Sequence, residues 1–375
     1  MNPFDLTYVT VDSLNEGVGS SQILPLIQRL AKAGLKVHLI TYEKEQIKDE
    51  TAISLSAKGV VWTHLPFESM GPVGALRRIG EIRNSIKDTK LIHARSDIPA
   101  VASLLSEKAP VLWDVRSLWS DQRAFMETNL LKRQIIRSSR VLEKYASNNS
   151  RAMSTLTHSV VPELEARYRK VPKIRIVVPT AVDLKRFQFS QEIPQKLVGL
   201  YSGTFNNYYD LDLSKEFTQE LDNISPTEIH WARPKESPTA TLGVGESQIF
   251  ESSQNEMANL ISRYSFGLSV CKLNAGPSLK AAMPTKIAEF LACGRPVVVS
   301  KGLGDFDEYI PEFNAGVILD GTAANLKTAS QELIEIISDP DTPMRCRALA
   351  EKYFDIDKGA NKYLDLYSQI ESDGK

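Results

Sequence analysis

Short runs rich in branched and aromatic residues alternate with helical patterns along almost the whole chain. The first runs that we interpret as strands are Leu6–Val11, Lys36–Thr41, Val60–His64, Leu91–Ala94, Val111–Asp114 and Ala152–Leu156. The pattern pauses over residues 178–189, and further runs follow at Leu197–Tyr201, Glu228–Trp231, Gly267–Cys271, Pro296–Ser300 and Ala315–Leu319. Alternation of this kind predicts an α/β fold of parallel sheets with helices on both faces.

The length of the chain predicts more than one domain, because 375 residues exceed the usual size of a single core. The pause in the pattern places the boundary near residue 186. We therefore expect an N-terminal Rossmann-like domain over 1–186, a second one over 187–352, and a final helix within 353–375. Two doubly wound sheets of this kind would bind ligands in a cleft at the carboxyl ends of their strands.

The segment from Pro284 to Ser300 reads as a short helix followed by a buried strand. Pro284 suits the first helical position, and Gly294 suits the left-handed residue that ends the helix. Lys286 and Glu289 are three residues apart, so they share one face near the helix N-terminus. A helix N-terminus beside a lysine attracts phosphate, and a carboxylate one turn later can accept hydrogen bonds from sugar hydroxyls. The segment therefore indicates a site for a nucleoside diphosphate.

Several segments in order along the chain resemble glycosyltransferase family 4, within the GT-B fold. They are the glycine-containing stretch 16–22, the strand region 34–41, the segment 171–187, the strand and turn Tyr201–Thr204, and Pro284–Ser300. The resemblance implies two Rossmann-like domains facing across a cleft. It also implies transfer of a sugar from a nucleotide donor with retention at the anomeric carbon, no bound metal, and a last helix that crosses back onto the N-terminal domain.

By this resemblance the C-terminal domain holds the donor. Glu289 would hold the ribose and Lys286 would lie near the diphosphate, with Pro284, Thr285, Gly203, Thr204 and Arg233 around them. The alternative for Lys286 and Glu289 is a surface salt bridge. The chain departs from the commoner pattern at Ala281, where many members have a glutamate for the donor sugar. It also has no cation in 202–210, so we expect Lys280 as the second cation that stabilises the leaving diphosphate.

The glycine turn at Gly17, Gly19 and Ser20 follows the first strand and lets backbone N–H groups approach an anion, here the donor. Two alternatives stay open. The turn can be structural only, or the chain can be a dinucleotide-binding enzyme with Glu43 on the ribose. Gln22 occupies the third glycine position of that fingerprint, which disfavours the nicotinamide cofactor.

The N-terminal domain carries polar residues after two of its predicted strands. Asp114 and Arg116 follow one strand, where they would act on the acceptor hydroxyl and on a phosphate or carboxylate. His93 and Arg95 end another strand and are acceptor-side candidates. The alternatives are an interior Asp–Arg pair that holds a loop, and a structural histidine.

Residues 130–145 read as one amphipathic helix with a basic side. Its cations are Lys132, Arg133, Arg137, Arg140 and Lys144, and the apolar side has Leu131, Ile135, Leu142 and Tyr145. The basic side could dock on an anionic membrane surface. Against this, we expect the apolar side to face the core.

Bulk properties narrow the class of protein. The net charge is −1, so no global field attracts nucleic acid. Three cysteines with no paired spacing predict buried, reduced thiols. The first residues do not read as a signal peptide and no apolar run reaches about 18 residues, so we expect neither secretion by that route nor a membrane-spanning helix. We expect a cytoplasmic protein, with a peripheral position on the inner face of the cytoplasmic membrane as the further option.

The resemblance therefore implies a glycosyltransferase of the hexosyltransferase type. It would move a sugar from a UDP- or GDP-linked donor to a sugar or lipid-linked acceptor, and association with the family implies a role in polysaccharide or glycolipid assembly. No separate cofactor is expected. The alternatives are a non-catalytic scaffold that binds a nucleotide sugar, suggested by Ala281, and a sugar-nucleotide epimerase.

Overall fold

The computed structural model describes residues 3–15, 17–44, 49–194, 196–203, 206–233, 249–251 and 254–373. Its contacts divide the chain into two compact units. The first unit comprises residues 1–120, 134–178 and 356–375, and the second comprises 121–133 and 179–355. Residues 121–133 and 179–186 group with the second unit, whereas we had placed them in the N-terminal domain, and residues 356–375 group with the first unit.

The first unit contains a parallel sheet that has seven strands among the described residues, in the order β3-β2-β1-β4-β5-β6-β7. Its strands are β1 (Phe4–Val9), β2 (Val37–Glu43), β3 (Val61–Pro66), β4 (Thr89–Arg95), β5 (Val111–Val115), β6 (Ala152–Thr155) and β7 (Ile174–Val177). The predicted strands are all present, with ends shifted by one or two residues. We did not predict β7, which lies at the sheet edge.

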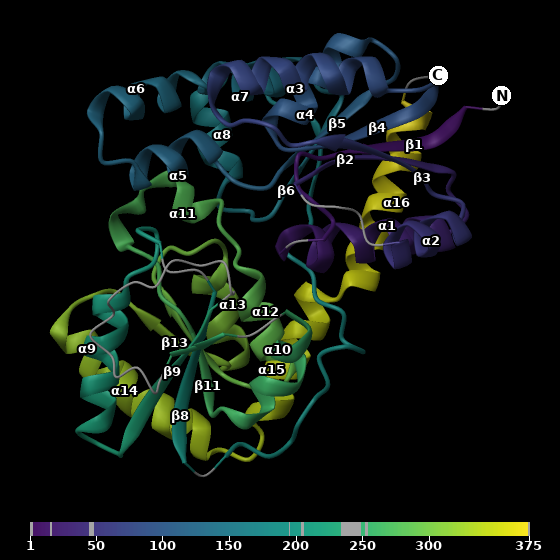
Figure 1. The fold of residues 1–375 in the computed structure, drawn as a ribbon. Coiled ribbons are helices and arrows are strands. Elements are labelled where there is room, and N and C mark those ends of the chain that lie inside the picture. The colour runs from purple at the N-terminus through teal and green to yellow at the C-terminus, as the bar shows by residue number, and fades with distance from the viewer. Residues whose placement is uncertain are drawn as a thin grey trace. The chain divides into compact units, whose positions relative to one another are not determined.

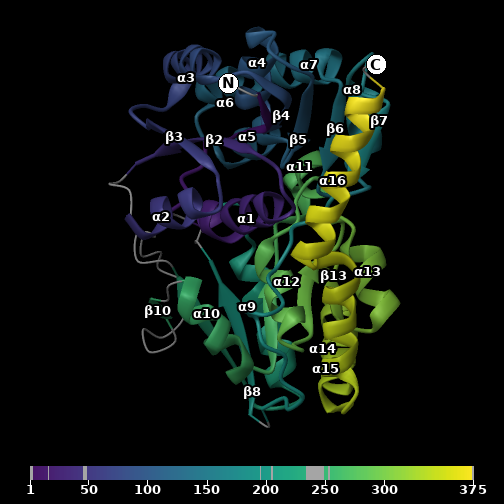
Figure 2. The ribbon, with the colours of Figure 1, turned by 90° about the vertical axis from the view of Figure 1, so that its right-hand side faces the viewer.

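Helices cover both faces of this sheet, as the alternation predicted (Figure 1). They are α1 (Leu24–Lys32), α2 (Asp49–Ala57), α3 (Gly71–Ser85), α4 (Asp97–Ser106), α7 (Arg140–Asn149), α8 (Val161–Arg167) and α16 (Ile356–Ser372). The first helix and the last lie side by side on one face (Figure 2). Their apolar side chains pack on Leu6, Leu39, Leu91 and Leu112 of the strands, so the last helix completes the core of the first unit.

The second unit has its own parallel sheet, with six strands among the described residues in the order β10-β9-β8-β11-β12-β13. The strands are β8 (Leu197–Ser202), β9 (Thr227–Arg233), β10 (Ile249–Glu251), β11 (Phe266–Ser269), β12 (Val297–Ser300) and β13 (Gly316–Leu319). The helices are α9 (Leu211–Asp222), α10 (Gln254–Leu260), α11 (Pro277–Lys280), α12 (Thr285–Ala292), α13 (Phe306–Phe313), α14 (Ala323–Ser338) and α15 (Thr342–Leu349). One face packs α9 and α14 against the strands through Phe217, Leu221 and Leu333. The short edge strand β10 was not predicted.

The predicted helix over 130–145 is wrong, because the structure has two helices there. They are α6 (Leu130–Ser138) and α7, and α5 (Trp119–Met126) precedes them. The hydroxyls of Ser138 and Ser139 donate to the carbonyls of Ile135 and Ile136, at 2.7 Å and 2.6 Å, at the point where the helix stops. Serine side chains that bond to the preceding turn compete with the helical backbone, which accounts for the break.

By this division the chain passes between the two units four times, after residues 120, 133, 178 and 355, and the segments that follow 178 and precede 356 pair within the second unit. The N–H of Val182 donates to the carbonyl of Phe354 at 2.7 Å, and Val182 forms an isolated bridge with Asp355. The final helix α16 begins directly afterwards.

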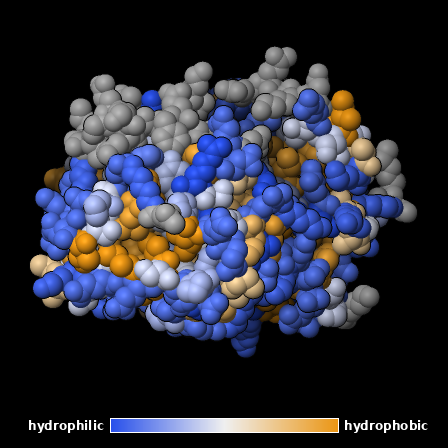
Figure 3. All heavy atoms as spheres, turned by 90° about the horizontal axis from the view of Figure 1, so that it is seen from below, coloured by the Kyte–Doolittle hydropathy of each residue, from blue (hydrophilic) through white to orange (hydrophobic). Residues whose placement is uncertain are grey.

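The cysteines and the surface can be compared with what the sequence predicted. Cys271, Cys293 and Cys346 are buried free thiols, as predicted. The face seen in Figure 3 is mostly hydrophilic, with hydrophobic atoms in smaller patches. Folded proteins expose much apolar surface, so these patches alone assign no function. Within the described part of the chain, no helix combines the length and the apolar character required to cross a membrane.

Candidate functional site

The helix α12 lies between Pro284 and Gly294, the two residues that we expected at its ends. Its N-cap is Pro284, with φ −61° and ψ 127°, one position earlier than the first helical position that we predicted. Gly294 takes φ +78°, and its N–H donates to Leu291 at 3.0 Å, while Arg295 donates to Phe290. This is the predicted left-handed end of the helix. The helix is therefore held to two turns, and its first turn presents Thr285 and Lys286.

The side chain of Lys286 is buried, with 9% exposure. Its Nζ atom lies 4.2 Å from the ring centroid of Tyr201 and 4.0 Å from that of Tyr209. Among the described residues Nζ has no hydrogen-bond partner. Burial lowers the pKa of Lys286 to about 8, opposed by Cys271 and Glu289. A buried ammonium held by two aromatic faces and lacking an acceptor is suited to an anionic ligand.

Glu289 lies one turn further along α12 and is also buried, with 7% exposure. Burial raises the pKa of Glu289 to about 7, and this rise is partly opposed by Arg186 and Lys286. The burial of both side chains rules out the surface salt bridge that we considered for this pair. Strongly perturbed groups of this kind, close together, are typical of binding and catalytic sites.

Two neighbouring strands end beside this helix start. Gly203 follows β8 with φ +130°, and a Cβ there would lie 3.0 Å from Lys286 Nζ, so a side chain would crowd the ammonium group. Arg233 ends β9, and the register pairs Ser202 with Ala232, the residues just before Gly203 and Arg233. The structure thus brings Gly203, Arg233, Thr285, Lys286 and Glu289 to one end of the second sheet.

Other donor-side candidates are placed less centrally. Lys280 is exposed and ends α11, a helix of a single turn. Ala281 is buried, with 2% exposure, as the residue that caps α11. Thr204 lies outside the described residues.

The glycine turn of the first unit is tied to the second strand by Glu43. The Glu43 carboxylate accepts hydrogen bonds from Ser13 Oγ at 2.5 Å, Leu14 N–H at 3.1 Å and Thr41 Oγ1 at 2.7 Å. Gly19 packs so closely that a Cβ would lie 1.8 Å from the Ser13 carbonyl oxygen. Because Glu43 is already engaged in the fold, the structure does not support it as a ribose ligand of a dinucleotide.

The rest of this turn is also held by local bonds. Gly17 takes φ +31°, and its carbonyl accepts from the hydroxyls of Ser20 at 3.1 Å and Ser21 at 2.8 Å. The turn is therefore a rigid connection into α1.

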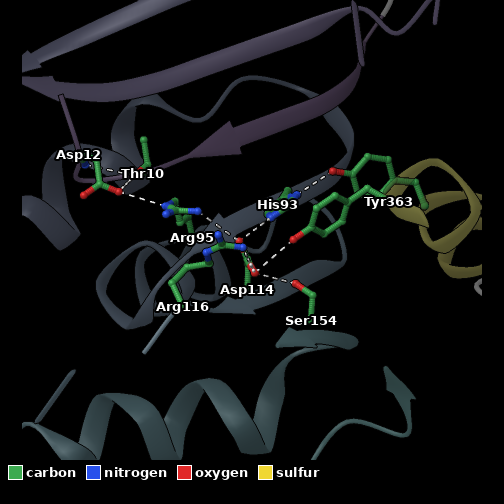
Figure 4. Close-up of polar contacts among 9 residues, drawn as sticks. Thr10, Asp12, His93, Arg95, Asp114, Arg116, Ser154 and Tyr363 are labelled. Atoms are coloured by element: carbon green, nitrogen blue, oxygen red, sulfur yellow. Dashed lines mark hydrogen bonds and ion pairs between the residues drawn. The ribbon is translucent and has the colours of Figure 1, made fainter. Parts of the chain in front are cut away.

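A buried polar cluster lies at the carboxyl ends of β1, β4, β5 and β6 of the first unit (Figure 4). We call it the strand-end cluster, and its members are Thr10, Asp12, His93, Arg95, Asp114, Arg116, Ser154, Tyr363 and Tyr367. Asp114 is its centre: one carboxylate oxygen accepts from Ser154 Oγ at 2.8 Å, and the other lies 3.3 Å from His93 Nε2. The Arg116 and Arg95 guanidinium groups stand 3.7 Å and 3.8 Å from the carboxylate.

The charges of the cluster set the protonation of Asp114. Burial alone would raise the pKa of Asp114, but Arg116, His93 and Arg95 outweigh it and hold this pKa well below its usual range. Asp114 is therefore a carboxylate at neutral pH. Arg95 also donates from Nε to Asp12 at 3.1 Å, whereas Arg116 Nε is buried without a hydrogen-bond partner among the described residues.

His93 occupies the inner end of this cluster. It is fully buried, with its ring 4.5 Å from that of Tyr8 and 4.9 Å from that of Tyr363. Its Nδ1 atom lies 2.6 Å from the Tyr367 hydroxyl. An acceptor could not reach either ring nitrogen without displacing Tyr367 or Asp114. The sequence missed both tyrosines as polar groups, because their spacing marks only a core-facing helix side.

Comparison with known proteins agrees with the architecture. Residues 230–353, inside the second unit, match the family model described as glycosyl transferases group 1. No curated protein sequence matches the chain. This family match supports glycosyl transfer as the general activity.

Solved structures resemble the whole chain. Sucrose-phosphate synthase from Thermosynechococcus elongatus has a TM-score of 0.69 at 15% identity, over 97% of this chain and 98% of that one. A glycosyltransferase from Rickettsia africae has a TM-score of 0.67 at 15% identity, over 99% of each chain. Anabaena HepE in complex with UDP-glucose has 0.63 at 12% identity, over 98% of each chain. The chain therefore has the GT-B fold.

Proposed function

We propose that this protein is a glycosyltransferase of family 4 that moves a hexose from a nucleoside diphosphate to an acceptor hydroxyl, with retention at the anomeric carbon and without a bound metal. The observation that carries the proposal is Lys286, a buried ammonium group at the start of α12 for which the described part of the chain supplies no hydrogen-bond acceptor. The fold and the family match of the second unit support the same activity.

In this proposal the second unit binds the donor. Lys286 and the N–H groups at the start of α12 donate hydrogen bonds to the diphosphate, and Glu289 accepts hydrogen bonds from the ribose. As the bond to the sugar breaks, negative charge grows on the leaving diphosphate. The ammonium group stabilises that charge without reorganisation, because its position is fixed by Tyr201 and Tyr209. Arg233 and Lys280 are the further cations that we assign to the diphosphate.

The first unit binds the acceptor. Asp114 accepts a hydrogen bond from the acceptor hydroxyl, and Arg116 binds a further oxygen of the acceptor through Nε, which has no partner among the residues that the structure describes. The acceptor is a sugar or a lipid-linked sugar in polysaccharide or glycolipid assembly. His93 and Arg95 support Asp114 from inside the cluster.

The donor is a UDP- or GDP-linked hexose. One related structure is Anabaena HepE with UDP-glucose, and another is TarM from S. aureus with UDP. These molecules make UDP the first nucleotide to test.

The first test is a thermal-shift panel with UDP, GDP, their glucose and mannose conjugates, and NAD. A ligand at about 100 times its Kd stabilises the folded state by about 2.7 kcal/mol, which gives a measurable shift. We expect a shift with UDP or GDP that Glu289→Ala abolishes. A shift with NAD alone, or with none of these, would contradict the proposed donor site. Nucleotide binding without release of UDP or GDP would favour the scaffold, and a changed sugar without an acceptor would favour the epimerase.

The helices α6 and α7 support a membrane-facing position for the enzyme. Of the apolar side chains that we expected in the core, Leu131 is exposed by 78%, Ile135 by 55% and Tyr145 by 40%, and Leu142 is half-buried. Leu130 and Val141 are exposed as well, by 71% and 64%. No described side chain of α6 is buried. The expectation was wrong because the break at Ser139 divides the amphipathic pattern between two helices.

The exposed charges of the same segment are all positive. Residues 130–149 carry Lys132, Arg133, Arg137, Arg140 and Lys144, and their one acidic residue, Glu143, is buried with 1% exposure. We propose that exposed apolar and basic side chains together dock this segment on an anionic membrane, each cation near the surface contributing about 1 kcal/mol.

Cosedimentation with vesicles tests this docking. We expect binding to vesicles that contain phosphatidylserine and little binding to pure phosphatidylcholine. Arg137→Glu with Lys144→Glu should release the protein, whereas Lys32→Glu with Lys58→Glu, an equal charge change elsewhere in the first unit, should not. Equal loss in both double variants would refute a local docking surface.

A further inference from the structure

Two tyrosines of the last helix reach into the strand-end cluster of the first unit. Tyr363 and Tyr367 are one helical turn apart, so they share a face of α16. Their exposures are 2% and 5%. The Tyr367 hydroxyl lies 2.6 Å from His93 Nδ1, and the Tyr363 hydroxyl donates to Asp114 Oδ1 at 3.4 Å (Figure 4). The two contacts join residues 274 and 249 positions apart in the sequence.

The surroundings of His93 define where its proton lies. Asp114 is a carboxylate and can only accept, so the ring nitrogen facing it, Nε2, must carry a hydrogen. Burial lowers the pKa of His93, which leaves the ring neutral with a single N–H. The other nitrogen, Nδ1, is then an acceptor, and Tyr367 is the group that donates to it. The opposite tautomer would turn the Nε2 lone pair toward the Asp114 carboxylate.

The inner contacts also decide how Asp114 faces the two arginines. Ser154, Tyr363 and His93 approach the carboxylate from the core side. The guanidinium groups of Arg95 and Arg116 lie at 3.8 Å and 3.7 Å, beyond hydrogen-bond distance, so attraction alone does not fix the carboxylate against them. Its orientation therefore depends on the hydrogen bonds from Ser154 and Tyr363 to Oδ1, and on the attraction at Oδ2 of the His93 N–H, which lies 3.3 Å away without forming a full hydrogen bond.

We propose that Tyr363 and Tyr367 are positioning residues for the acceptor-side cluster: Tyr367 holds His93 in the Nε2-protonated tautomer, and Tyr363 and His93 together orient Asp114 beside Arg116. The proposal rests on the proposed function, which gives Asp114 and Arg116 the acceptor. It makes the last helix of the chain part of the site of the first unit. The hydroxyl groups carry this role, and the rings carry the packing, so Tyr→Phe substitutions separate the two.

The test compares Tyr367→Phe and Tyr363→Phe with Tyr42→Phe. Tyr42 is a matched control, because it is 1% exposed in the same unit and its hydroxyl donates to Glu81 at 2.9 Å, on a different helix. Two readouts are needed. The first is the ¹⁵N spectrum of histidine-labelled full-length protein, with His93 identified among the five histidines by His93→Gln. The second is release of UDP from UDP-glucose in water, or of GDP from GDP-glucose where only GDP gives a thermal shift.

We expect His93 in the wild-type protein to carry its proton on Nε2. In Tyr367→Phe the Nδ1 signal should change and His93 should titrate at higher pH, because the hydrogen bond that favours the neutral ring is lost. The kcat for nucleotide release should fall about tenfold in Tyr367→Phe and somewhat less in Tyr363→Phe, with the KM for the nucleotide sugar unchanged. Tyr42→Phe should change neither kcat nor the His93 spectrum.

A wild-type His93 protonated at Nδ1 would overturn the proposal, as would an unchanged His93 spectrum in Tyr367→Phe. An equal fall of kcat in Tyr42→Phe would show a general loss of stability and would also overturn it. Failure of the proposed function looks different. The wild-type protein would then bind neither UDP nor GDP, while the histidine spectrum still decides whether Tyr367 holds His93.

Discussion

Replacing Lys286 by methionine distinguishes two effects of its buried ammonium group. One is the free energy by which the buried charge destabilises the folded state, and the other is its contribution to binding an anion. Methionine keeps the length and the apolar stem of lysine, so the contacts with Tyr201 and Tyr209 remain. Burial lowers the pKa of Lys286 from 10.5 to about 8. At 1.36 kcal/mol per pKa unit, burying the charged form costs the folded state about 3 kcal/mol. Lys286→Met should therefore be more stable than the wild type at neutral pH.

The same substitution should weaken nucleotide binding. A charge-assisted hydrogen bond to a phosphate contributes about 1.5–3 kcal/mol, so the Kd for UDP or GDP should rise by about 10- to 150-fold. Near pH 7 about nine in ten molecules already carry the charged lysine, since its pKa is about 8. Above pH 8 the wild-type affinity should fall about tenfold per pH unit, because binding must then take up a proton. The variant should lack this dependence.

Isothermal titration calorimetry from pH 6 to pH 9.5 measures the affinity, and urea denaturation of the ligand-free protein measures the stability. Lys362→Met is the matched control: burial also lowers the pKa of Lys362, and its ammonium group donates to the Val177 carbonyl at 3.3 Å in the first unit. The control should bind as the wild type does. The reasoning is refuted if Lys286→Met binds normally, or if its affinity still falls above pH 8.

Three further predictions concern other parts of the molecule. We expect the affinity for the nucleotide to rise between pH 6 and pH 8, since the pKa of Glu289 is about 7 and only its ionised form is a full acceptor for the ribose hydroxyls. Glu289→Gln should remove this rise, and calorimetry that finds the same increase in affinity in the variant would contradict the prediction. Gly19→Ala should destabilise the first unit by about 1–3 kcal/mol, because its Cβ would lie 1.8 Å from the Ser13 carbonyl oxygen; an unchanged urea midpoint would argue against the turn as described. Burial and the nearby Glu143 raise the pKa of Asp97 from 3.8 to about 8. Between these two pH values the folded state holds a proton that the unfolded chain releases. The stability that depends on this proton is therefore complete below about pH 4 and is lost as the pH rises to about 8. Asp97→Asn should thus be more stable than the wild type at pH 8 and nearly equal to it near pH 4, and equal unfolding curves at pH 8 would refute the shift.

The sequence predicted those features that depend on neighbouring residues. Pro284 and Gly294 bracket α12, and the strands around them follow from short apolar runs. Both sheets, except their edge strands β7 and β10, and the burial of Val297–Val299 could therefore be predicted. Lys286 and Glu289 could be paired because their spacing on a helix is fixed.

Features that depend on distant parts of the chain could not be predicted. Tyr209 reaches Lys286 because the residues after β8 return to pair with Cys271, and no local pattern encodes that return. The tyrosines of α16 resemble ordinary core residues until their partners, more than two hundred positions earlier, are known. The break at Ser139 depends on two hydroxyls that bond to the preceding turn, which helical periodicity does not reveal.

The final helix also sets the order in which the protein can mature on the ribosome. The second unit ends at Asp355, whereas the first unit needs residues 356–375 to complete its core. Synthesis proceeds from the N-terminus, and domains generally fold as units once their segments have emerged. The first unit therefore cannot complete its core until the second unit has been synthesised. Until then the apolar face of the first unit that α16 covers stays exposed. A nascent chain that has emerged from the ribosome as far as residue 355 would display a complete second unit and an unfinished first one, and it is at this stage that the chain would most need a chaperone.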